Sequence, residues 1–137
     1  MLDEIEVLTL FSTNVSASKA FYQKVFERPI LYEDDVSFVL GFDTIAINIL
    51  ALSEAPELVT PSEPIEVGAA VQSVMTVRVS SVDAACERIA SLGVALLNGP
   101  IDRPWGRRTA AFADPSGYVW ELAEVIGEAG AAPGDVG

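Results

Sequence analysis

The chain has 137 residues, of which half are hydrophobic and a fifth are charged, a composition typical of one globular domain that excludes bulk disorder. Twenty acidic residues against eight basic ones give a net charge of −12, which disfavours binding to nucleic acid and to anionic membranes. The chain has no histidine, which excludes Ser-His-Asp and Cys-His catalysis and histidine-based zinc or iron sites. Its single cysteine, Cys86, cannot form an intramolecular disulfide.

The first predicted elements are a strand and a helix. A mostly apolar, β-prone run of about six residues begins at Val7. Residues 12–14 (Ser-Thr-Asn) have side-chain oxygens that can satisfy the first free backbone N–H groups of a helix, so they predict its N-cap. Ala17, Phe21 and Val25 then recur at the spacing of one helix face. The chain therefore opens with a predicted strand that is followed by a predicted helix.

Strand-like segments follow this helix, and a linker follows them. The predicted strands are Ile30–Glu33, Val36–Phe42 and Thr44–Leu50. Residues 53–72 combine several prolines with several glutamates. This composition predicts an exposed, semi-rigid linker over the surface.

The second half of the sequence repeats the first. When Val74 is aligned with Val7, Thr76 falls on Thr9 and the spacing between the two segments stays constant. Residues 80–81 (Ser-Ser) predict a second helix N-cap. The apolar stripe of the predicted second helix consists of Val82, Ala85, Ile89 and Leu92.

The second half also ends in strands. Gly93 offers a left-handed stop for the second helix, and Cys86 beside the apolar stripe is predicted to be buried and inert. The predicted strands are Val94–Gly99, Arg107–Ala113 and Tyr118–Val125, with a turn at residues 114–117 (Asp-Pro-Ser-Gly). Each half therefore has the order βαβββ, in an α+β fold.

These modules define the predicted domain organisation. We expect a single domain over residues 1–126, with module one at 5–52, the linker at 53–72 and module two at 73–126. Residues 127–137 have no periodicity and predict a flexible tail. The acidic N-terminal segment has no basic signal region and the chain has one cysteine, so we expect a cytoplasmic protein.

The opening and closing segments resemble those of a known family. Residues 7–22, ending in Ser-Lys-Ala-Phe-Tyr, are similar to the strand-plus-helix signature of the vicinal oxygen chelate superfamily, which includes glyoxalases, bleomycin-resistance proteins and extradiol dioxygenases. The segment 104–122, with Pro-Trp-Gly-x-Arg and Phe-x-Asp-Pro-x-Gly, is the most specific match, and the resemblance covers about residues 5–126. It implies two βαβββ modules that form a curled, eight-stranded cup, in a homodimer.

The same resemblance places the metal ligands of the metal-using members. These positions fall on Val7, Asn48, Val74 and Glu121, with Asn48 matched only loosely. Because valine has no lone pair to donate, the set is a poor metal site. Without histidine and with one cysteine, the chain leaves only oxygen-ligand metals such as Mg²⁺ or Ca²⁺ open. The expected cofactor is none, and the resemblance is closest to the metal-free bleomycin-resistance-like proteins.

Strand alternation predicts which side chains face the cup. Phe11, Phe38 and Phe42 would stack on a planar ligand, or pack in the core. Trp105 would lie at a rim, where it would stack on the ligand or make a dimer contact. Glu121 would hold a cationic group of the ligand or pair with Arg78 or Arg108, although Arg108 is equally suited to be a structural anchor. The expected ligand-binding residues are Val7, Thr9, Phe11, Phe38, Phe42, Asn48, Val74, Thr76, Arg78, Trp105, Arg108 and Glu121.

The leading hypothesis is metal-independent sequestration of a small molecule. The acidic composition favours a neutral or cationic ligand with a hydrophobic or aromatic body, such as an antibiotic, unless the charge only solubilises the surface. The alternative is an enzyme of the superfamily (an isomerase, lyase or dioxygenase) with an atypical metal site or a metal-free mechanism around Glu121. A third possibility is a dimeric accessory module without a ligand.

Overall fold

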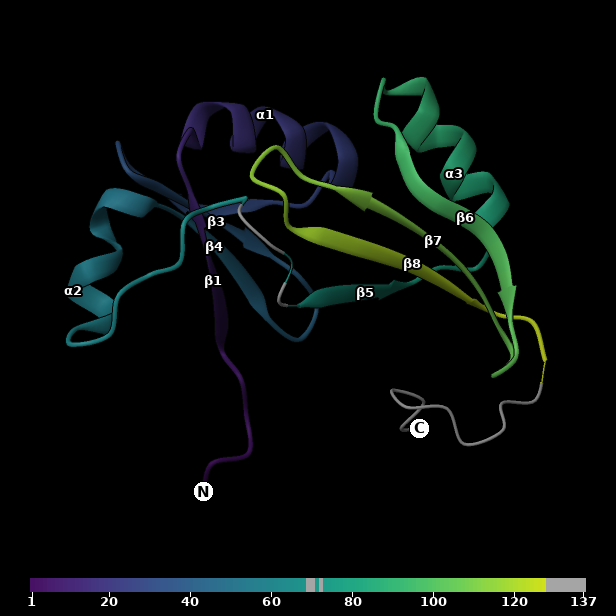
Figure 1. Cartoon of the computed structure of the whole chain (residues 1–137), viewed down its shortest axis with the longest axis horizontal. Helices are drawn as coiled ribbons and strands as arrows, with labels where there is room; N and C mark the ends of the chain where they lie inside the picture. Colours follow the sequence, from purple (N-terminus) through teal and green to yellow (C-terminus); the bar gives the residue numbers. More distant parts are fainter. Residues whose placement is uncertain (69–70, 72, 128–137) are drawn as a thin grey trace. The chain divides into compact units, whose positions relative to one another are not determined.

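The computed structural model describes residues 1–68, 71 and 73–127 (Figure 1). The chain divides into two compact units. Unit one contains residues 1–70 together with 114–117, and unit two contains residues 71–113 together with 118–137. The predicted tail at 127–137 lies outside the described residues except for Gly127.

Unit one is a mixed sheet with a long helix. Its elements are β1 (Val7–Ser12), α1 (Val15–Phe26), β2 (Ile30–Glu33), β3 (Ser37–Gly41), β4 (Ala46–Ala51), the 3₁₀ turn η1 (Leu52–Glu54) and α2 (Ala55–Val59). The strand order in the sheet is β1-β4-β3-β2, in which β1 is parallel to β4 and the other neighbours are antiparallel.

Unit two repeats this topology. Its elements are β5 (Val74–Arg78), α3 (Val82–Ser91), β6 (Leu96–Arg103), β7 (Arg107–Ala113) and β8 (Val119–Val125). The strand order is β5-β8-β7-β6, again with one parallel pair, β5 and β8. Within the described residues the chain thus forms two four-stranded mixed sheets, which confirms the predicted α+β class and the βαβββ order of both halves.

Both long helices begin at the predicted polar clusters. The side chain of Asn14 accepts a hydrogen bond of 3.0 Å from the backbone N–H of Ala17, and Oγ of Ser81 accepts one of 3.1 Å from the N–H of Ala84. Helix α3 ends just before Gly93, which has the left-handed conformation predicted for it, with a φ of 80°. The sequence therefore specifies the ends of these helices locally.

Each helix covers one face of its own sheet and forms a core there. In unit one, Tyr22 of α1 lies beside Phe38 of β3, with ring centroids 6.3 Å apart, and both side chains are fully buried. In unit two, the buried side chains include Val82, Cys86, Ile89, Phe112, Trp120 and Leu122. Cys86 is buried as predicted, and burial raises the pKa of its thiol.

One predicted strand end is wrong, and the predicted linker contains a helix that the sequence analysis did not identify. η1 and α2 occupy residues 52–59, and Ala55 is fully buried, so this part of residues 53–72 is not wholly exposed. Strand β6 runs to Arg103 instead of stopping at Gly99, because a register shift against β7 between Asn98 and Ile101 lets the strand continue. Residues 69, 70 and 72 of the predicted linker lie outside the described residues. None of the helices in the described parts of the chain is long and apolar enough to cross a membrane.

Candidate functional site

The face of each sheet opposite its long helix carries most of the residues expected to bind a ligand. We call it the distal face. In unit one, Leu10 and Ile49 are buried on the helix side, whereas Thr9 and Asn48 alternate with them along β1 and β4 and are only half-buried. In unit two the exposed side chain of Thr76 lies opposite Glu121. These side chains of the distal faces therefore stay accessible, whereas Thr109 and Ala123 of the distal face of unit two are buried.

The distal face of unit one has a threonine–asparagine pair at its centre. Thr9 of β1 is directly opposite Asn48 of β4, and Nδ2 of Asn48 donates a hydrogen bond of 3.4 Å to Oγ1 of Thr9. Val7 lies two residues before Thr9 and is 41% exposed. Phe11 lies two residues after Thr9 and is half-buried. This face therefore offers an amide and a hydroxyl between two apolar side chains.

The distal face of unit two has the corresponding pair, with a carboxylate in place of the amide. Thr76 of β5 is opposite Glu121 of β8, and Oγ1 of Thr76 donates a hydrogen bond of 3.0 Å to Oε1 of Glu121. Val74 is 51% exposed and lies two residues before Thr76. Arg78 lies two residues after it and is exposed.

These registers establish which positions of the two units correspond. Thr9 and Thr76 occupy the same place in the repeat, and each lies on the first strand of a parallel pair. Asn48 and Glu121 are therefore equivalent, as the loose sequence alignment proposed. Val7 and Val74 are also equivalent, because each lies two residues before the threonine of its strand.

This set of residues does not fit a metal ion. The two valines offer no electron pair, and the set supplies one amide on unit one and one carboxylate on unit two, which is fewer protein donors than Ca²⁺ or Zn²⁺ takes. In the described chain no group of three or more His, Cys, Asp or Glu residues lies close enough to hold a metal.

A tryptophan and an arginine lie at the edge of the second sheet. Trp105 lies in the turn between β6 and β7, outside the strands as predicted, and is 37% exposed. The guanidinium carbon of Arg103 lies 6.0 Å from the centre of its ring, a cation–π distance. Arg103 is absent from the predicted site because the sequence analysis ended its strand at Gly99.

The expectation that Phe38 and Phe42 line the cup is wrong. Phe38 is opposite Ile49, so it faces α1, and it is fully buried beside Tyr22. Phe42 follows the end of β3 and contacts Phe26 of α1, with ring centroids 5.8 Å apart. Both phenylalanines belong to the helix side because Val39, between them in sequence, is the residue that pairs with Asn48.

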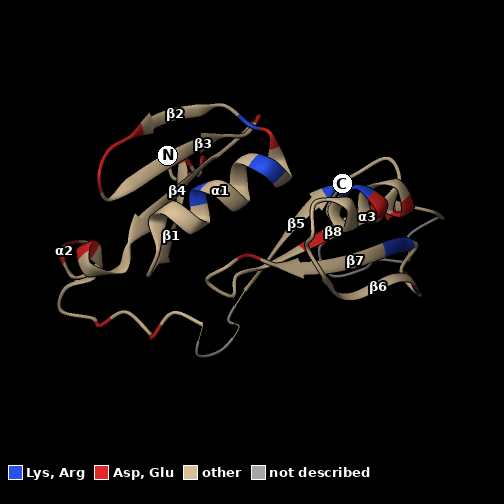
Figure 2. Ribbon diagram, turned by 90° about the horizontal axis from the view of Figure 1, so that it is seen from above, with Lys and Arg blue, Asp and Glu red and all other residues tan. Residues whose placement is uncertain are grey.

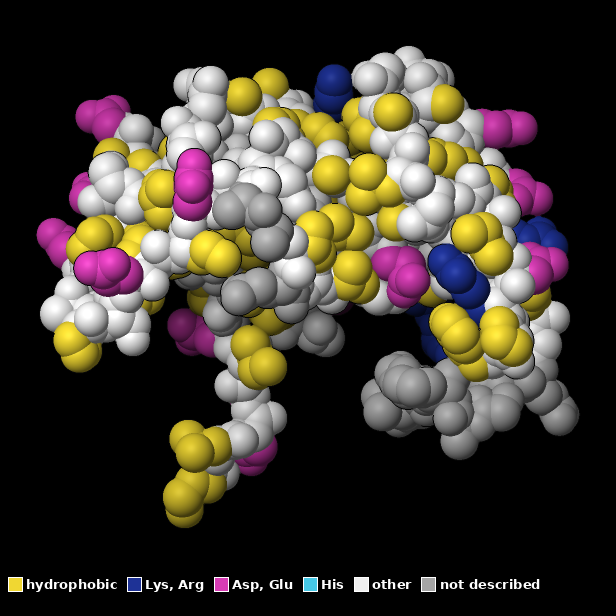
Figure 3. Space-filling model, viewed as in Figure 1, with side chains coloured by type: hydrophobic (Ala, Val, Ile, Leu, Met, Phe, Trp, Pro, Cys, Tyr) yellow, Lys and Arg dark blue, Asp and Glu magenta, His cyan; other side chains and the backbone are white. Residues whose placement is uncertain are grey.

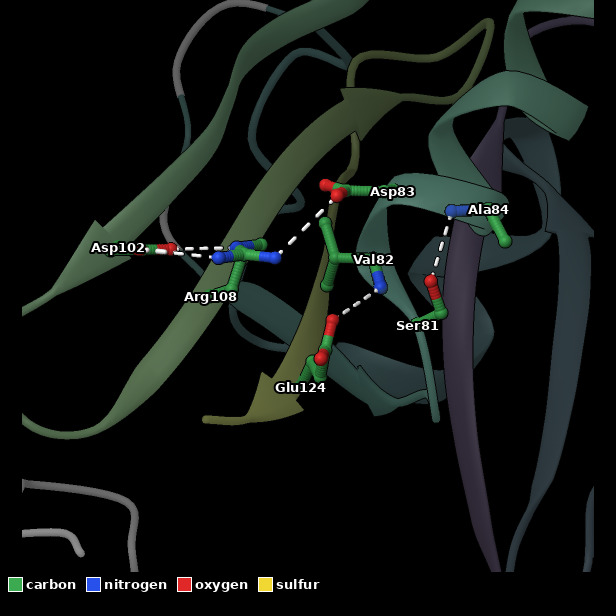
Figure 4. A network of polar contacts seen from close by, with 7 residues as sticks. All are labelled: Ser81, Val82, Asp83, Ala84, Asp102, Arg108 and Glu124. Carbon is green, nitrogen blue, oxygen red and sulfur yellow. Dashed lines mark hydrogen bonds and ion pairs between the residues drawn. The ribbon is translucent and has the colours of Figure 1, made fainter. Parts of the chain in front are cut away.

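Arg108 also lies on the helix side, where it acts as a structural anchor (Figure 4). Its Nε donates a hydrogen bond of 2.7 Å to Asp102 of β6, and its Nη1 lies 3.5 Å from Asp83 of α3. The hydrogen bond from Arg108 lowers the pKa of the Asp102 carboxyl, and the same bond raises the pKa of Arg108. Arg108 therefore does not reach the face of Glu121, which is the opposite side of the sheet.

The same network fixes the start of α3. Oε1 of Glu124 accepts a hydrogen bond of 2.8 Å from the backbone N–H of Val82, which is one of the free donors at the start of that helix (Figure 4). Glu124 is opposite Arg108 in the pairing of β7 with β8. The sequence analysis did not identify this role of Glu124.

Solved structures with the same fold are numerous and distant in sequence. A glyoxalase/bleomycin resistance protein/dioxygenase from Nocardioides superposes with a TM-score of 0.82 at 23% identity, covering 100% of this chain and 91% of that one. A glyoxalase-related enzyme from Fulvimarina pelagi gives 0.77 at 21% identity, with coverages of 96% and 100%. A lactoylglutathione lyase from Agrobacterium tumefaciens gives 0.71 at 18% identity, with coverages of 88% and 92%.

These likenesses establish the fold and not the activity. No curated protein sequence matches the chain. The family model of the Glyoxalase/Bleomycin resistance protein/Dioxygenase superfamily matches residues 4–122, which include both sheets almost completely. The chain therefore belongs to the glyoxalase/bleomycin resistance protein/dioxygenase superfamily.

Proposed function

We propose that the chain binds a small organic molecule with an apolar or aromatic body, without a metal ion and without turnover, as the metal-free bleomycin-resistance-like members do. The observation that carries the proposal is the pair of aliphatic residues, Val7 and Val74, at equivalent places on the two distal faces. Each valine lies one pleat from a threonine that is hydrogen-bonded to an amide or a carboxylate.

The affinity would come from burial of apolar surface. Val7 and Phe11 leave accessible apolar area on the distal face of unit one, and Val74 leaves such area on that of unit two, which a ligand on the respective face would cover. Each Å² of apolar area removed from water contributes about 25 cal/mol, part of which is offset by the lost freedom of the ligand. On each distal face, the threonine pair of that face would orient a ligand bound there through hydrogen bonds.

The polar groups favour binding over acid–base catalysis. Among the described strand residues of the two distal faces, Glu121 is the only carboxylate. Proton transfer between two carbon or oxygen positions of a substrate usually employs a second acid or base, and the chain has no histidine to supply it. Glu121 is therefore proposed as an orienting acceptor of ligand hydrogen bonds.

The experiment is a thermal-shift screen, followed by native mass spectrometry, of a panel of aromatic compounds and antibiotics. Each compound is tested on untreated protein and on protein dialysed against EDTA. We expect binding that EDTA does not change and bound compounds that leave chemically unaltered. Binding that vanishes with EDTA and returns with a divalent metal, or conversion of a compound during incubation, would overturn the proposal.

A matched pair of variants locates the binding face. Thr76→Val removes a hydroxyl from the distal face of unit two, and Thr44→Val removes one from the exposed segment between β3 and β4. We expect Thr76→Val alone to lower the affinity of a compound found in the screen. Equal affinities for both variants would place the ligand elsewhere.

A further inference from the structure

Three of the six arginines of the chain lie on the distal face of unit two. Arg78 is opposite Ala123 in the pairing of β5 with β8, and Ala123 is opposite Thr109 of β7. Nε of Arg103 donates a hydrogen bond of 3.0 Å to Oγ1 of Thr109, so this side chain lies along the same face. Arg107 is opposite Arg103 and shares the parity of Thr109. Cations from β5, β6 and β7 thus lie on both sides of the small Ala123.

The acidic residues of unit two are distributed differently. Asp83, Asp102 and Glu124 lie on the helix side, where Arg108 and the start of α3 engage them. Figure 2 shows further acidic residues on α3. The distal face of unit two has one carboxylate, Glu121, among its described strand residues, so its arginines outnumber its acids. The net charge of −12 therefore does not describe this face.

Arg78 is the cation best suited to a ligand. Its side chain is exposed, and it makes no hydrogen bond or ion pair with another residue in the described chain. Figure 3 shows basic and acidic side chains next to one another in the region of β5 and β8. A guanidinium binds carboxylate and phosphate groups through two parallel hydrogen bonds, which are shorter and stronger than its hydrogen bonds to neutral groups.

We infer that the ligand is an organic anion, with a carboxylate or phosphate held by Arg78 and Arg103 and an apolar ring placed toward Trp105. The inference rests on the proposed binding function and specifies its ligand class. Thr76 lies one pleat from Arg78 and donates its hydroxyl proton to Glu121, so the Glu121 carboxylate and the Thr76 oxygen can accept hydrogen bonds from a hydroxyl or amide of the same molecule. The sign of the ligand charge is opposite to the one that the acidic composition favours.

The test uses four probes with the same ring and different charges, namely 1-naphthoate, 1-naphthyl phosphate, 1-naphthalenemethanol and 1-naphthylmethylammonium. Their dissociation constants are measured by isothermal titration calorimetry. Since a hydrogen bond to a charged group contributes about 1.5–3 kcal/mol, we expect one of the anions to bind about tenfold or more tightly than the alcohol, and the ammonium to bind most weakly. The preference between naphthoate and naphthyl phosphate distinguishes the two anions. Added salt should weaken only the anions.

Two variants with the same charge change provide the control. Arg78→Gln removes the cation from the distal face, and Arg88→Gln removes one from the exposed last turn of α3. We expect Arg78→Gln to weaken binding of the preferred anion about tenfold and to leave the alcohol unchanged, whereas Arg88→Gln changes neither.

The outcomes separate this inference from the proposed function. Equal affinities for alcohol and anions, or equal effects of the two variants, would overturn the anionic ligand and leave metal-independent binding in place. A requirement for a metal would overturn the proposed function, whichever charge is preferred. Failure of all four probes to bind would overturn the anionic aromatic ligand, whereas the proposed function is tested separately by the compound panel.

Discussion

Oη of Tyr22 donates a hydrogen bond of 2.6 Å to Oδ2 of Asp114, across 92 positions of the sequence. Both side chains are buried, and Asp114 also accepts a hydrogen bond of 2.9 Å from the backbone N–H of Ser116, inside the turn predicted at residues 114–117. A local turn residue thus serves a second, long-range purpose. A single side chain on α1 recognises the turn after β7.

Replacing Tyr22 with Phe tests this relationship. The substitution removes one donor from a buried carboxylate, so we expect the free energy of unfolding to fall by about 1.5–3 kcal/mol, measured by urea denaturation. Tyr32→Phe is the control, because Oη of Tyr32 donates a similar bond of 2.9 Å to Asp34 on the surface. We expect Tyr32→Phe to change the free energy by less than about 0.5 kcal/mol. Equal effects of the two substitutions would contradict the role assigned to burial.

Gly99 is predicted to be irreplaceable within β6. It has a φ of 94°, and a Cβ atom placed on it would lie 2.5 Å from the backbone oxygen of Thr109. Gly99→Ala therefore combines a left-handed backbone with a clash against backbone atoms, and we expect a loss of about 3 kcal/mol or more in urea denaturation.

Gly93→Ala is the control for Gly99→Ala. Gly93 also has a positive φ, of 80°, but a Cβ there would meet nothing within 4 Å. We expect Gly93→Ala to lower the free energy of unfolding by about 1–2 kcal/mol, which is the cost of placing a Cβ on a backbone with positive φ. If Gly93→Ala is as damaging as Gly99→Ala, the close approach of β6 to β7 is not what requires the glycine.

The acid stability of unit two should depend on Asp102. The hydrogen bond from Arg108 lowers the pKa of this carboxyl below its ordinary value of 3.8. The ionised form therefore stabilises the fold, fully at pH values above the ordinary pKa, and this contribution is lost as the pH falls through the lowered one. We expect Asp102→Asn to lower the melting temperature at neutral pH and to reduce its further fall in acid.

The Arg108→Gln background tests whether Arg108 is the group that lowers the pKa of Asp102. Without the guanidinium, Asp102→Asn should no longer alter the dependence of the melting temperature on pH, in a double-mutant cycle. A persistent effect of Asp102→Asn in that background would show that another group lowers this pKa.

Glu121→Gln should affect the ligand and not the fold. Glu121 is half-buried, and its amide replacement can still accept the hydrogen bond from Thr76. We expect an unchanged melting temperature, within the range typical of accessible substitutions, and a change in affinity for a bound ligand. Because the substitution removes a negative charge near Arg78, an anionic ligand should bind Glu121→Gln more tightly. Weaker binding of an anion would contradict the proposed arrangement.

The sequence predicts the features that depend on local chemistry. The N-caps at Asn14 and Ser81, the stop at Gly93 and the turn at residues 114–117 follow from side chains next to the backbone groups they satisfy. The repeat fixes the equivalence of Thr9 with Thr76, and strand alternation then places Glu121 on the distal face.

The errors arise where pairing with an element distant in the sequence determines the face on which a side chain lies or the length of a strand. Phe38 and Phe42 have the spacing of a strand face, but only the pairing with β4 determines which face contains Val39 and which contains Phe38. The Gly99–Pro100 dipeptide is typical of a strand end, so the continuation of β6 and the position of Arg103 were missed. Pro56 and Glu57 are typical of a first helical turn and could have identified α2.

Metal content is the most direct test of the central claim. The purified protein, untreated and after equilibration with Zn²⁺, Ni²⁺, Mn²⁺, Fe²⁺ and Mg²⁺ followed by desalting, is analysed by inductively coupled plasma mass spectrometry. Because Val7 and Val74 donate no electron pair, we predict substoichiometric amounts of every metal. One equivalent of a divalent metal that is retained by the protein and lost in Glu121→Gln would contradict the account.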